Sequence, residues 1–402
     1  MSEATPVAGA EGRRLDLDWL RIGAFATLIL YHVGMFYVPW DWHVKSPRQI
    51  DELVWPMSFF SPWRLTLLFL VSGAATRYLA DKLPLGRFAW ARFWRLFPPL
   101  LLAVFVVVPP QSYYEIVEKI AYAGGPTAFY RGYVTASGGW CRNGECLITP
   151  TYNHLWFVAY LLVYTLLLAA LLKLARPAFG RMQAGVERGL AGAGALLWPM
   201  LWLVLIRLVL LPRFEITHAL IDDWYNHALS LSAFLLGFLI VKSPAVWVAL
   251  ERWRWTALTI GIAAFALYGP YVWTFRAEDA TPPEDLRRLM RLVGGVDQWA
   301  WIAAALGFAS RYLRRADGPV RRYLTEAIFP FYIVHQTVTV VAGHHLAKLR
   351  LPLGLEFVLL AAITFGGCVL AFELVRRVKW LRPWFGLKMH DSRGLAREPR
   401  PA

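Results

Sequence analysis

The chain alternates long apolar runs with short polar or charged stretches, and many of the runs approach 20 residues. An α-helix rises about 1.5 Å per residue, so about 20 residues cross the roughly 30 Å hydrocarbon core of a bilayer. We therefore predict an all-α fold, a polytopic bundle of transmembrane helices. The ten expected spans, with boundaries good to a few residues, are 17–38, 58–79, 90–108, 153–174, 193–211, 226–241, 253–275, 296–312, 324–346 and 354–375.

Composition and charge placement support a membrane protein and give its orientation. Of 402 residues, 57% are hydrophobic and 17% are charged, which excludes an ordinary soluble protein. The 20 tryptophans and 17 tyrosines fit the aromatic belts of membrane interfaces. Of the 42 Lys and Arg residues, 27 lie in alternate connecting segments, which should therefore face the cytoplasm together with both termini. The same bias explains the net charge of +15, so no nucleic-acid partner is expected.

The spans leave little chain for any other domain. We expect one integral membrane domain over 17–387, between cytoplasmic tails at 1–16 and 388–402. The longest external loop, 109–152, is either a simple connection or a cover for a site.

Two local features need the structure to decide them. Cys141 and Cys146 lie in the long external loop, and the sequence leaves open whether they form a disulfide there. Pro98 and Pro99 fall inside the third apolar run and should kink its helix just after Arg95.

The first apolar run carries two ionisable residues, Arg21 and His32. Eleven steps of roughly 100° make about three turns, so both side chains leave one helix face, about 16 Å apart along the axis. Ionisable groups within a span usually face a protein cavity. Arg21 is either a donor-binding cation or an interfacial arginine paired with Asp18. His32 is either a neutral histidine bonded to a neighbouring helix or a general base.

Arg92 and Arg95 are separated by two residues, so they share a helix face at the cytoplasmic end of the third span. Two guanidinium groups offer forked donors that match phosphate oxygens. The alternative is that both are ordinary cytoplasmic charge.

Four more residues could contact a substrate or stabilise the helix bundle. His154 opens the fourth span and is either an interfacial residue or part of a site. His335 lies within the ninth span, where hydrogen bonding between helices competes with catalysis. Arg64 and Arg207 lie within spans toward the external side. Either one could hold an anionic substrate group or pair with a carboxylate.

No metal site is expected. His344 and His345 are adjacent on a helix and point about 100° apart, and Asp222 and Asp223 show no metal-binding spacing. We find none of the common nucleotide-binding or hydrolase motifs.

Several stretches together resemble acyltransferase family 3, whose members are integral membrane proteins that acylate extracytoplasmic carbohydrates. The resemblance rests on the Arg21 to His32 spacing, on Arg92 and Arg95, and on LDWLR at 17–21, LLFLVSGAATRYL at 67–79, NHLWFVAYLL at 153–162 and IFPFYIVHQ at 328–336. Two further stretches, WHVKSP at 42–47 and VPPQSYYE at 108–115, are similar to a branch that succinylates periplasmic glucans. The middle of the chain, roughly 175–300, carries no such stretch.

The resemblance implies a bacterial inner-membrane enzyme with a cytoplasmic acyl-CoA donor, a periplasmic glycan acceptor and no bound cofactor. Arg92 and Arg95 would bind the donor phosphates, Arg21 would orient the donor, and His32 would be catalytic, as a base or as an acylated intermediate. If the acyl group is succinyl, its free carboxylate needs a cation, for which Arg64 and Arg207 are candidates. The sequence leaves open whether the protein forms a homo-oligomer.

Two other functions compete with this interpretation. One is a transporter that moves an acyl donor or an anionic metabolite without chemistry. The other, a glycosyltransferase or a sensor, is disfavoured because the chain shows no acidic metal-binding motif and no signalling domain.

Overall fold

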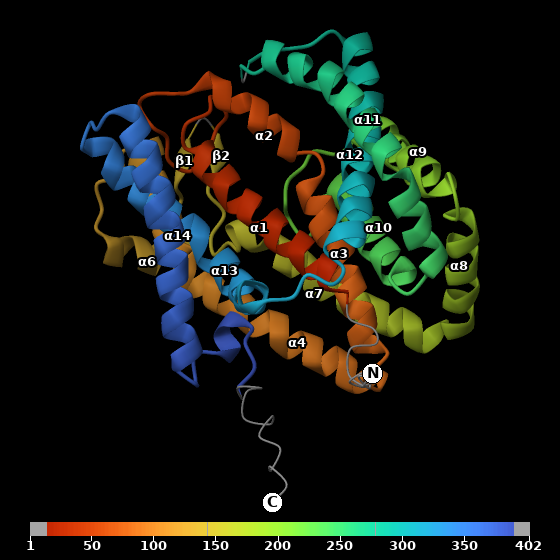
Figure 1. Cartoon of the computed structure of the whole chain (residues 1–402). Helices are drawn as coiled ribbons and strands as arrows, with labels where there is room; N and C mark the ends of the chain where they lie inside the picture. The colour runs from red at the N-terminus through yellow and green to blue at the C-terminus, as the bar shows by residue number, and fades with distance from the viewer. Residues whose placement is uncertain (1–13, 143, 278, 390–402) are drawn as a thin grey trace, which may run out of the picture.

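The computed structural model describes residues 14–142, 144–277 and 279–389, so the two expected tails lie mostly outside it. Within the described residues the chain is helical except for loops and one short hairpin, β1 (Cys141–Arg142) paired with β2 (Glu145–Cys146) (Figure 1). The all-α prediction is confirmed.

Each of the ten expected spans overlaps a helix of the described chain. Seven helical stretches are long and apolar enough to cross a membrane, or up to eight if one bent pair counts as a single span. α1 is not among them because Asp18, Arg21 and His32 interrupt its apolar character, and α10 is short. The helices concerned are α1 (Leu15–Met35), α2 with α3 (Val54–Phe60, Arg64–Ala80), α4 (Leu85–Leu102), α7 (Trp156–Leu174), α9 (Gly194–Val209), α10 (Trp224–Ile240), α11 (Pro244–Thr274), α12 (Glu284–Tyr312), α13 (Pro319–Lys348) and α14 (Leu353–Arg377).

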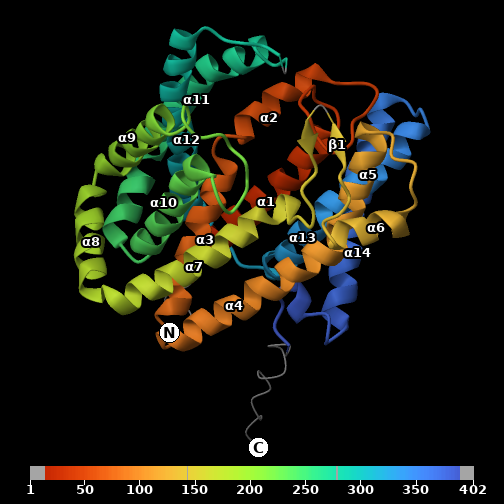
Figure 2. The same cartoon turned by 180° about the vertical axis from the view of Figure 1, so that it is seen from behind.

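α1 lies in the middle of the bundle, in contact with α3, α12, α13 and α14 (Figures 1 and 2). Its buried apolar side chains include a stripe of Ile22, Phe25, Ile29 and Val33, and Leu17 and Leu28 are buried on another face, whereas Leu30 is exposed. A membrane helix that carries ionisable residues is favoured where other helices pack around those residues. The ionisable residues of α1 therefore fit this central position.

α3 and α10 pack closely because each has a glycine where the other helix approaches. A Cβ atom on Gly73 would lie 1.8 Å from the carbonyl oxygen of Phe234, and one on Gly237 would lie 1.9 Å from that of Leu70. Small residues that let backbones approach are the usual basis of helix association in membranes. Gly73 belongs to one of the stretches that carry the family resemblance.

Charged side chains collect at the helix ends that the topology assigns to the cytoplasm. Arg321, at the start of α13, contacts Asp18 of α1 at 2.6 Å. Arg382 follows α14 and contacts Glu326 of α13 at 3.1 Å. The start of α1 and the segment after α14 thus lie at the same end of the bundle, as the predicted topology requires.

The stretch 109–152, which is predicted to be external, is folded. It contains α5 (Pro109–Lys119), α6 (Pro126–Val134) and the hairpin, in which Cys141 and Cys146 form a disulfide (Figure 2). His344, near the end of α13, contacts Glu118 of α5 at 2.7 Å. The stretch therefore packs on the membrane domain.

Two connecting regions depart from a simple helix. Pro98 and Pro99 lie within α4, which continues through both, and the regular α-helix gives way later, at the π-helical turn η2 (Ala103–Val107). α8 (Arg176–Gly189) precedes α9 at an angle of 111° and buries none of its residues. It is a surface helix between two spans.

Candidate active site

Two histidines from different helices meet at the end of α1 that is predicted to face outward. The Nδ1 atom of His32 lies 2.7 Å from Nε2 of His335, and Nδ1 of His335 lies 2.7 Å from the carbonyl oxygen of Tyr332. A carbonyl oxygen only accepts, so His335 donates from Nδ1 and its neutral ring accepts at Nε2. His32 must then donate from its own Nδ1.

These two hydrogen bonds determine which nitrogen carries the proton on each ring. With Nδ1 of His32 protonated, the lone pair of a neutral His32 ring is on Nε2. His32 also lines a cavity among the described residues. An imidazole held in one tautomer by a hydrogen bond to its other nitrogen is the arrangement of a general base or nucleophile.

His154 packs beside this pair and is bound on both sides. Its Nε2 atom lies 3.1 Å from the carbonyl oxygen of Ile333, and the Gln111 amide lies 3.4 Å from its Nδ1. Its ring meets that of His335 edge-on, with centroids 5.1 Å apart. His154 is therefore buried next to His335, whereas the interfacial alternative would leave it exposed.

A second hydrogen-bonded group lies at the same end of the bundle and was missed by the sequence analysis. His43 places Nδ1 2.6 Å from Glu115 of α5, and its Nε2 lies 2.9 Å from the Gln336 amide nitrogen. Gln336 also donates to Gln111 at 3.0 Å. His43 belongs to WHVKSP, and Gln111 and Glu115 belong to VPPQSYYE. Both stretches carry part of the family resemblance, and only the structure shows that their polar residues meet.

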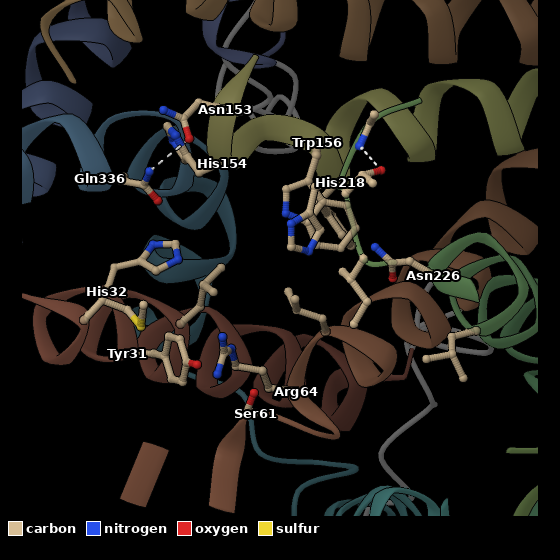
Figure 3. Close-up of a pocket in the computed structure, with 18 of the residues that line it drawn as sticks. Tyr31, His32, Ser61, Arg64, Asn153, His154, Trp156, His218, Asn226 and Gln336 are labelled. Atoms are coloured by element: carbon tan, nitrogen blue, oxygen red, sulfur yellow. Dashed lines mark hydrogen bonds between the residues drawn. The ribbon is translucent and has the colours of Figure 1, made fainter. Parts of the chain in front are cut away.

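The cavity has a volume of about 960 Å³ and lies among α1, α3, α10 and the start of α7 (Figure 3). Helices distant in sequence contribute to it, and its lining mixes aromatic, amide and cationic side chains. Figure 3 shows several of them directed toward one space: Tyr31, His32, Arg64, Asn153, Trp156 and Asn226.

A loop over this cavity is held by a buried carboxylate. Asp223, which is fully buried, accepts hydrogen bonds from the backbone nitrogen of His218 at 3.1 Å and from the Asn226 amide at 2.9 Å. The His218 ring stacks on Trp156 at 4.4 Å between centroids, and burial lowers the pKa of His218 below its ordinary value. Asp223, set aside as a metal ligand, is thus a support for the cavity wall.

Arg64 and Arg207 both line the cavity, but their surroundings differ. The Arg64 guanidinium lies 3.4 Å from the centre of the Tyr31 ring, and its Nε and Nη1 atoms are buried without a hydrogen-bond partner among the described residues. Arg207 donates from Nε to Gln298 at 3.1 Å. Gln298 in turn donates to Thr66 at 2.6 Å.

The three arginines expected to bind the donor lie near one another at the other end. Arg21 lies 3.8 Å from Asp18 and 3.3 Å from the carbonyl oxygen of Thr325. Arg92 is buried beside α7 and experiences electrostatic repulsion from Arg95 and Arg21. Arg95 is exposed on the same helix. The pairing of Arg21 with Asp18 is thus present, within a cluster of cations.

In the part of the chain that the structure describes, no three His, Cys, Asp or Glu side chains could together hold a metal ion. The site consists of a histidine pair and a cavity at one end of α1, and an arginine cluster at the other.

Comparisons with known proteins identify the family. A family model described as an acyltransferase domain, acyltransferase family 3, matches residues 14–373. The chain belongs to this family and is a multi-pass membrane acyltransferase.

Among curated proteins, the chain is similar to the glucans biosynthesis proteins C of Salmonella paratyphi B and Salmonella heidelberg. Each is 27% identical over 154 residues, which is 38% of this chain and 37% of the relative. The matched region thus spans less than two-fifths of these relatives' length. No solved structure matches the chain.

Proposed function

We propose that the protein transfers a short acyl group, succinyl or acetyl, from cytoplasmic acyl-CoA to a hydroxyl of a glycan on the far side of the bacterial inner membrane. Family membership supports acyl transfer, and the relatives' name, glucans biosynthesis protein C, supports a glucan or a similar glycan as the acceptor. The observation that carries the proposal is the His32–His335 hydrogen bond beside a large cavity.

In the proposed reaction, Nε2 of His32 takes the proton from the acceptor hydroxyl as its oxygen attacks the thioester carbonyl carbon. The new C–O bond forms, the C–S bond breaks, and the CoA thiolate takes up the proton from the His32 imidazolium. His335 keeps the His32 ring in the required tautomer. The second possibility is that Nε2 attacks the thioester carbon and expels the CoA thiolate. The hydroxyl oxygen then attacks the acyl-histidine, the C–N bond breaks, and the hydroxyl proton passes to the thiolate.

Arg21, Arg92 and Arg95 would bind the phosphates of the donor. A cluster of guanidinium groups favours an anion, and their forked donors match phosphate oxygens. Arg21 and His32 share a face of α1 about 16 Å apart, so an extended pantetheine arm along α1 would bring the thioester to His32.

Mass spectrometry of cell-envelope glycans tests the proposal directly. We compare cells that produce the wild-type protein, His32→Gln or no protein. The wild type should add an acyl mass to a glycan, and both other strains should lack it.

The His32→Gln protein, once purified, should still bind acyl-CoA. Normal acylation by this variant would eliminate His32 as the reacting group. If the glycans are unmodified in all three strains and the purified protein moves acyl-CoA across the membrane of lipid vesicles, the transporter is supported instead.

A further inference from the structure

Gln336 is a buried amide in the cavity wall, and its two ends have different surroundings. The residue is 2% exposed and lines the cavity. Its Nε2 atom lies 2.9 Å from Nε2 of His43, 3.0 Å from Oε1 of Gln111 and 3.4 Å from Oδ1 of Asn153. Its Oε1 atom has no hydrogen-bond partner among the described residues, although it is not one of the polar atoms sealed from solvent. An accessible amide oxygen in a cavity wall suits a ligand that donates a hydrogen bond.

The orientation of this amide follows from a chain of hydrogen bonds that begins at a backbone carbonyl. The carbonyl oxygen of Val107 only accepts, so the Thr337 hydroxyl, at 2.6 Å, must donate to it. Thr337 therefore accepts from the NH₂ group of Gln111 at 2.5 Å. The oxygen of Gln111 then faces Gln336, which must present its own NH₂ group to that oxygen.

A second chain, from the opposite side, gives the same orientation. Nδ1 of His43 lies 2.6 Å from the Glu115 carboxylate, which also contacts Lys119 at 3.3 Å. A carboxylate only accepts, so His43 donates from Nδ1 and its neutral ring accepts at Nε2. Gln336 must again present its NH₂ group there. Both chains leave the oxygen of Gln336 as the end that is free to accept from a ligand in the cavity.

The position of Gln336 relates this oxygen to the reacting group. His335 and Gln336 are consecutive residues of α13, and His335 is hydrogen-bonded to His32. His32 and Gln336 both line the cavity, and Figure 3 shows the Gln336 amide facing the His32 ring. An amide oxygen repels the negative oxygen that forms on a thioester under attack, so its partner must carry an N–H or O–H group.

We propose that Oε1 of Gln336 binds the acceptor, by accepting a hydrogen bond from a second hydroxyl of the sugar ring whose first hydroxyl reacts at His32. This inference rests on the proposed function and names the acceptor group that its site recognises. Two hydrogen-bond acceptors that face one cavity, Nε2 of neutral His32 and Oε1 of Gln336, match two hydroxyl groups of one sugar. His43, Gln111 and Glu115 are positioning residues, because they hold the amide and do not themselves contact the acceptor.

An amide N–H of the pantetheine arm of the donor offers the same chemistry. The acceptor is the better assignment because the hydrogen bonds that orient Gln336 lead to His43 and Glu115, at the end of α1 predicted to face outward. The acceptor must arrive from that side. The arginine cluster, where the donor is proposed to bind, lies at the other end.

The test uses the full-length protein in lipid nanodiscs, with succinyl-CoA and acetyl-CoA each offered as donor. The acceptor is the glycan fraction isolated from cells that lack the protein. The KM for this glycan, kcat, and the dissociation constant for each acyl-CoA are measured for wild type, Gln336→Met, Gln336→Glu and Glu115→Met.

Gln336→Met keeps the length of the side chain and removes the oxygen. It should raise the glycan KM by about 10-fold, the effect of one hydrogen bond lost in a buried site, with kcat and the acyl-CoA dissociation constants changed by less than about 3-fold. Gln336→Glu keeps an oxygen at this place and should raise the glycan KM less. Glu115→Met leaves the oxygen but releases the His43 ring, so it should also raise the glycan KM by less than Gln336→Met.

A KM does not depend on the fraction of the preparation that is folded. If Gln336→Met fails to fold, Glu115→Met still tests the inference, because Glu115 lies in the stretch predicted to be external. An unchanged glycan KM in that variant would then overturn it.

The outcomes separate this inference from the function on which it rests. An unchanged glycan KM in Gln336→Met would overturn the role of the oxygen and leave acyl transfer intact. Equal increases in Gln336→Met and Gln336→Glu would also overturn it, because they would trace the effect to the NH₂ group. A rise in the acyl-CoA dissociation constants alone would assign the oxygen to the pantetheine arm. Failure of the wild type to acylate any glycan would remove the proposed function, and this inference with it.

Discussion

His32 of α1 donates a hydrogen bond to His335 of α13 across 2.7 Å, and the two rings lie parallel at 3°. The Tyr332 carbonyl oxygen fixes the other side of His335. The tautomer of His32 is therefore set by a residue more than 300 positions away in sequence.

Replacement of His335 should lower turnover with little effect on donor binding. His335→Phe keeps a ring of similar shape but removes the acceptor, so His32 loses its fixed tautomer. We expect kcat to fall about 100-fold, within the range of general-base effects, with KM for acyl-CoA changed less than about 3-fold. Steady-state transfer kinetics measure both values. A large rise in KM with kcat unchanged would show that His335 serves the donor site instead.

The arginine cluster should matter for donor binding and not for the chemical step. Arg92→Ala combined with Arg95→Ala removes two phosphate partners, so the dissociation constant for acyl-CoA should rise by at least about 10-fold. The loss should be smaller at high salt, which screens exposed charges. Titration of the purified protein checks this.

The matched control for that experiment is Arg181→Ala with Arg188→Ala. These arginines lie on the surface helix α8 and give the same change in net charge. If both double variants weaken binding equally, the effect is one of overall charge and the phosphate role is wrong.

Gly73 should tolerate no side chain. Alanine there would place a Cβ atom 1.8 Å from the Phe234 carbonyl oxygen, so α3 and α10 must separate. We expect Gly73→Ala to destabilise the folded protein by about 1–3 kcal/mol, the usual range for overpacking. Thermal unfolding in detergent measures the effect.

Gly366→Ala serves as its control, because no atom lies within 4 Å of a Cβ at that position of α14. Its melting temperature should stay near that of the wild type or rise, since alanine favours helix over glycine. Equal melting temperatures for the two alanine variants would contradict the close contact of α3 and α10.

The disulfide provides a test of orientation. Cys141 and Cys146 are exposed in the structure, on the side predicted to be external. A membrane-impermeant maleimide should label them in intact spheroplasts only after reduction. A reporter fused after residue 390 should read as cytoplasmic. Labelling of the cysteines from the cytoplasmic side alone would reverse the topology.

Much of the fold follows from the sequence, because lipid leaves a chain few choices. Every backbone group must be satisfied within the hydrocarbon core, so each long apolar run must become a helix. The positions of Arg21 and His32 on one face of α1 follow from helix geometry alone. Apolar run length did not predict the helices within 109–152. There, amphipathic segments form α5 and α6 by packing on the rest of the protein.

The tertiary structure decided which polar residues meet. The sequence places His335 in a span, but it does not show that His32 is its hydrogen-bond partner. It also does not show that His43 contacts Glu115 and Gln336. Arg64 and Arg207 are equivalent by sequence, as intramembrane arginines toward the same side. Only packing gives Arg207 an amide partner and leaves Arg64 on a tyrosine ring, because helix order in a bundle depends on contacts between distant segments and not on local periodicity.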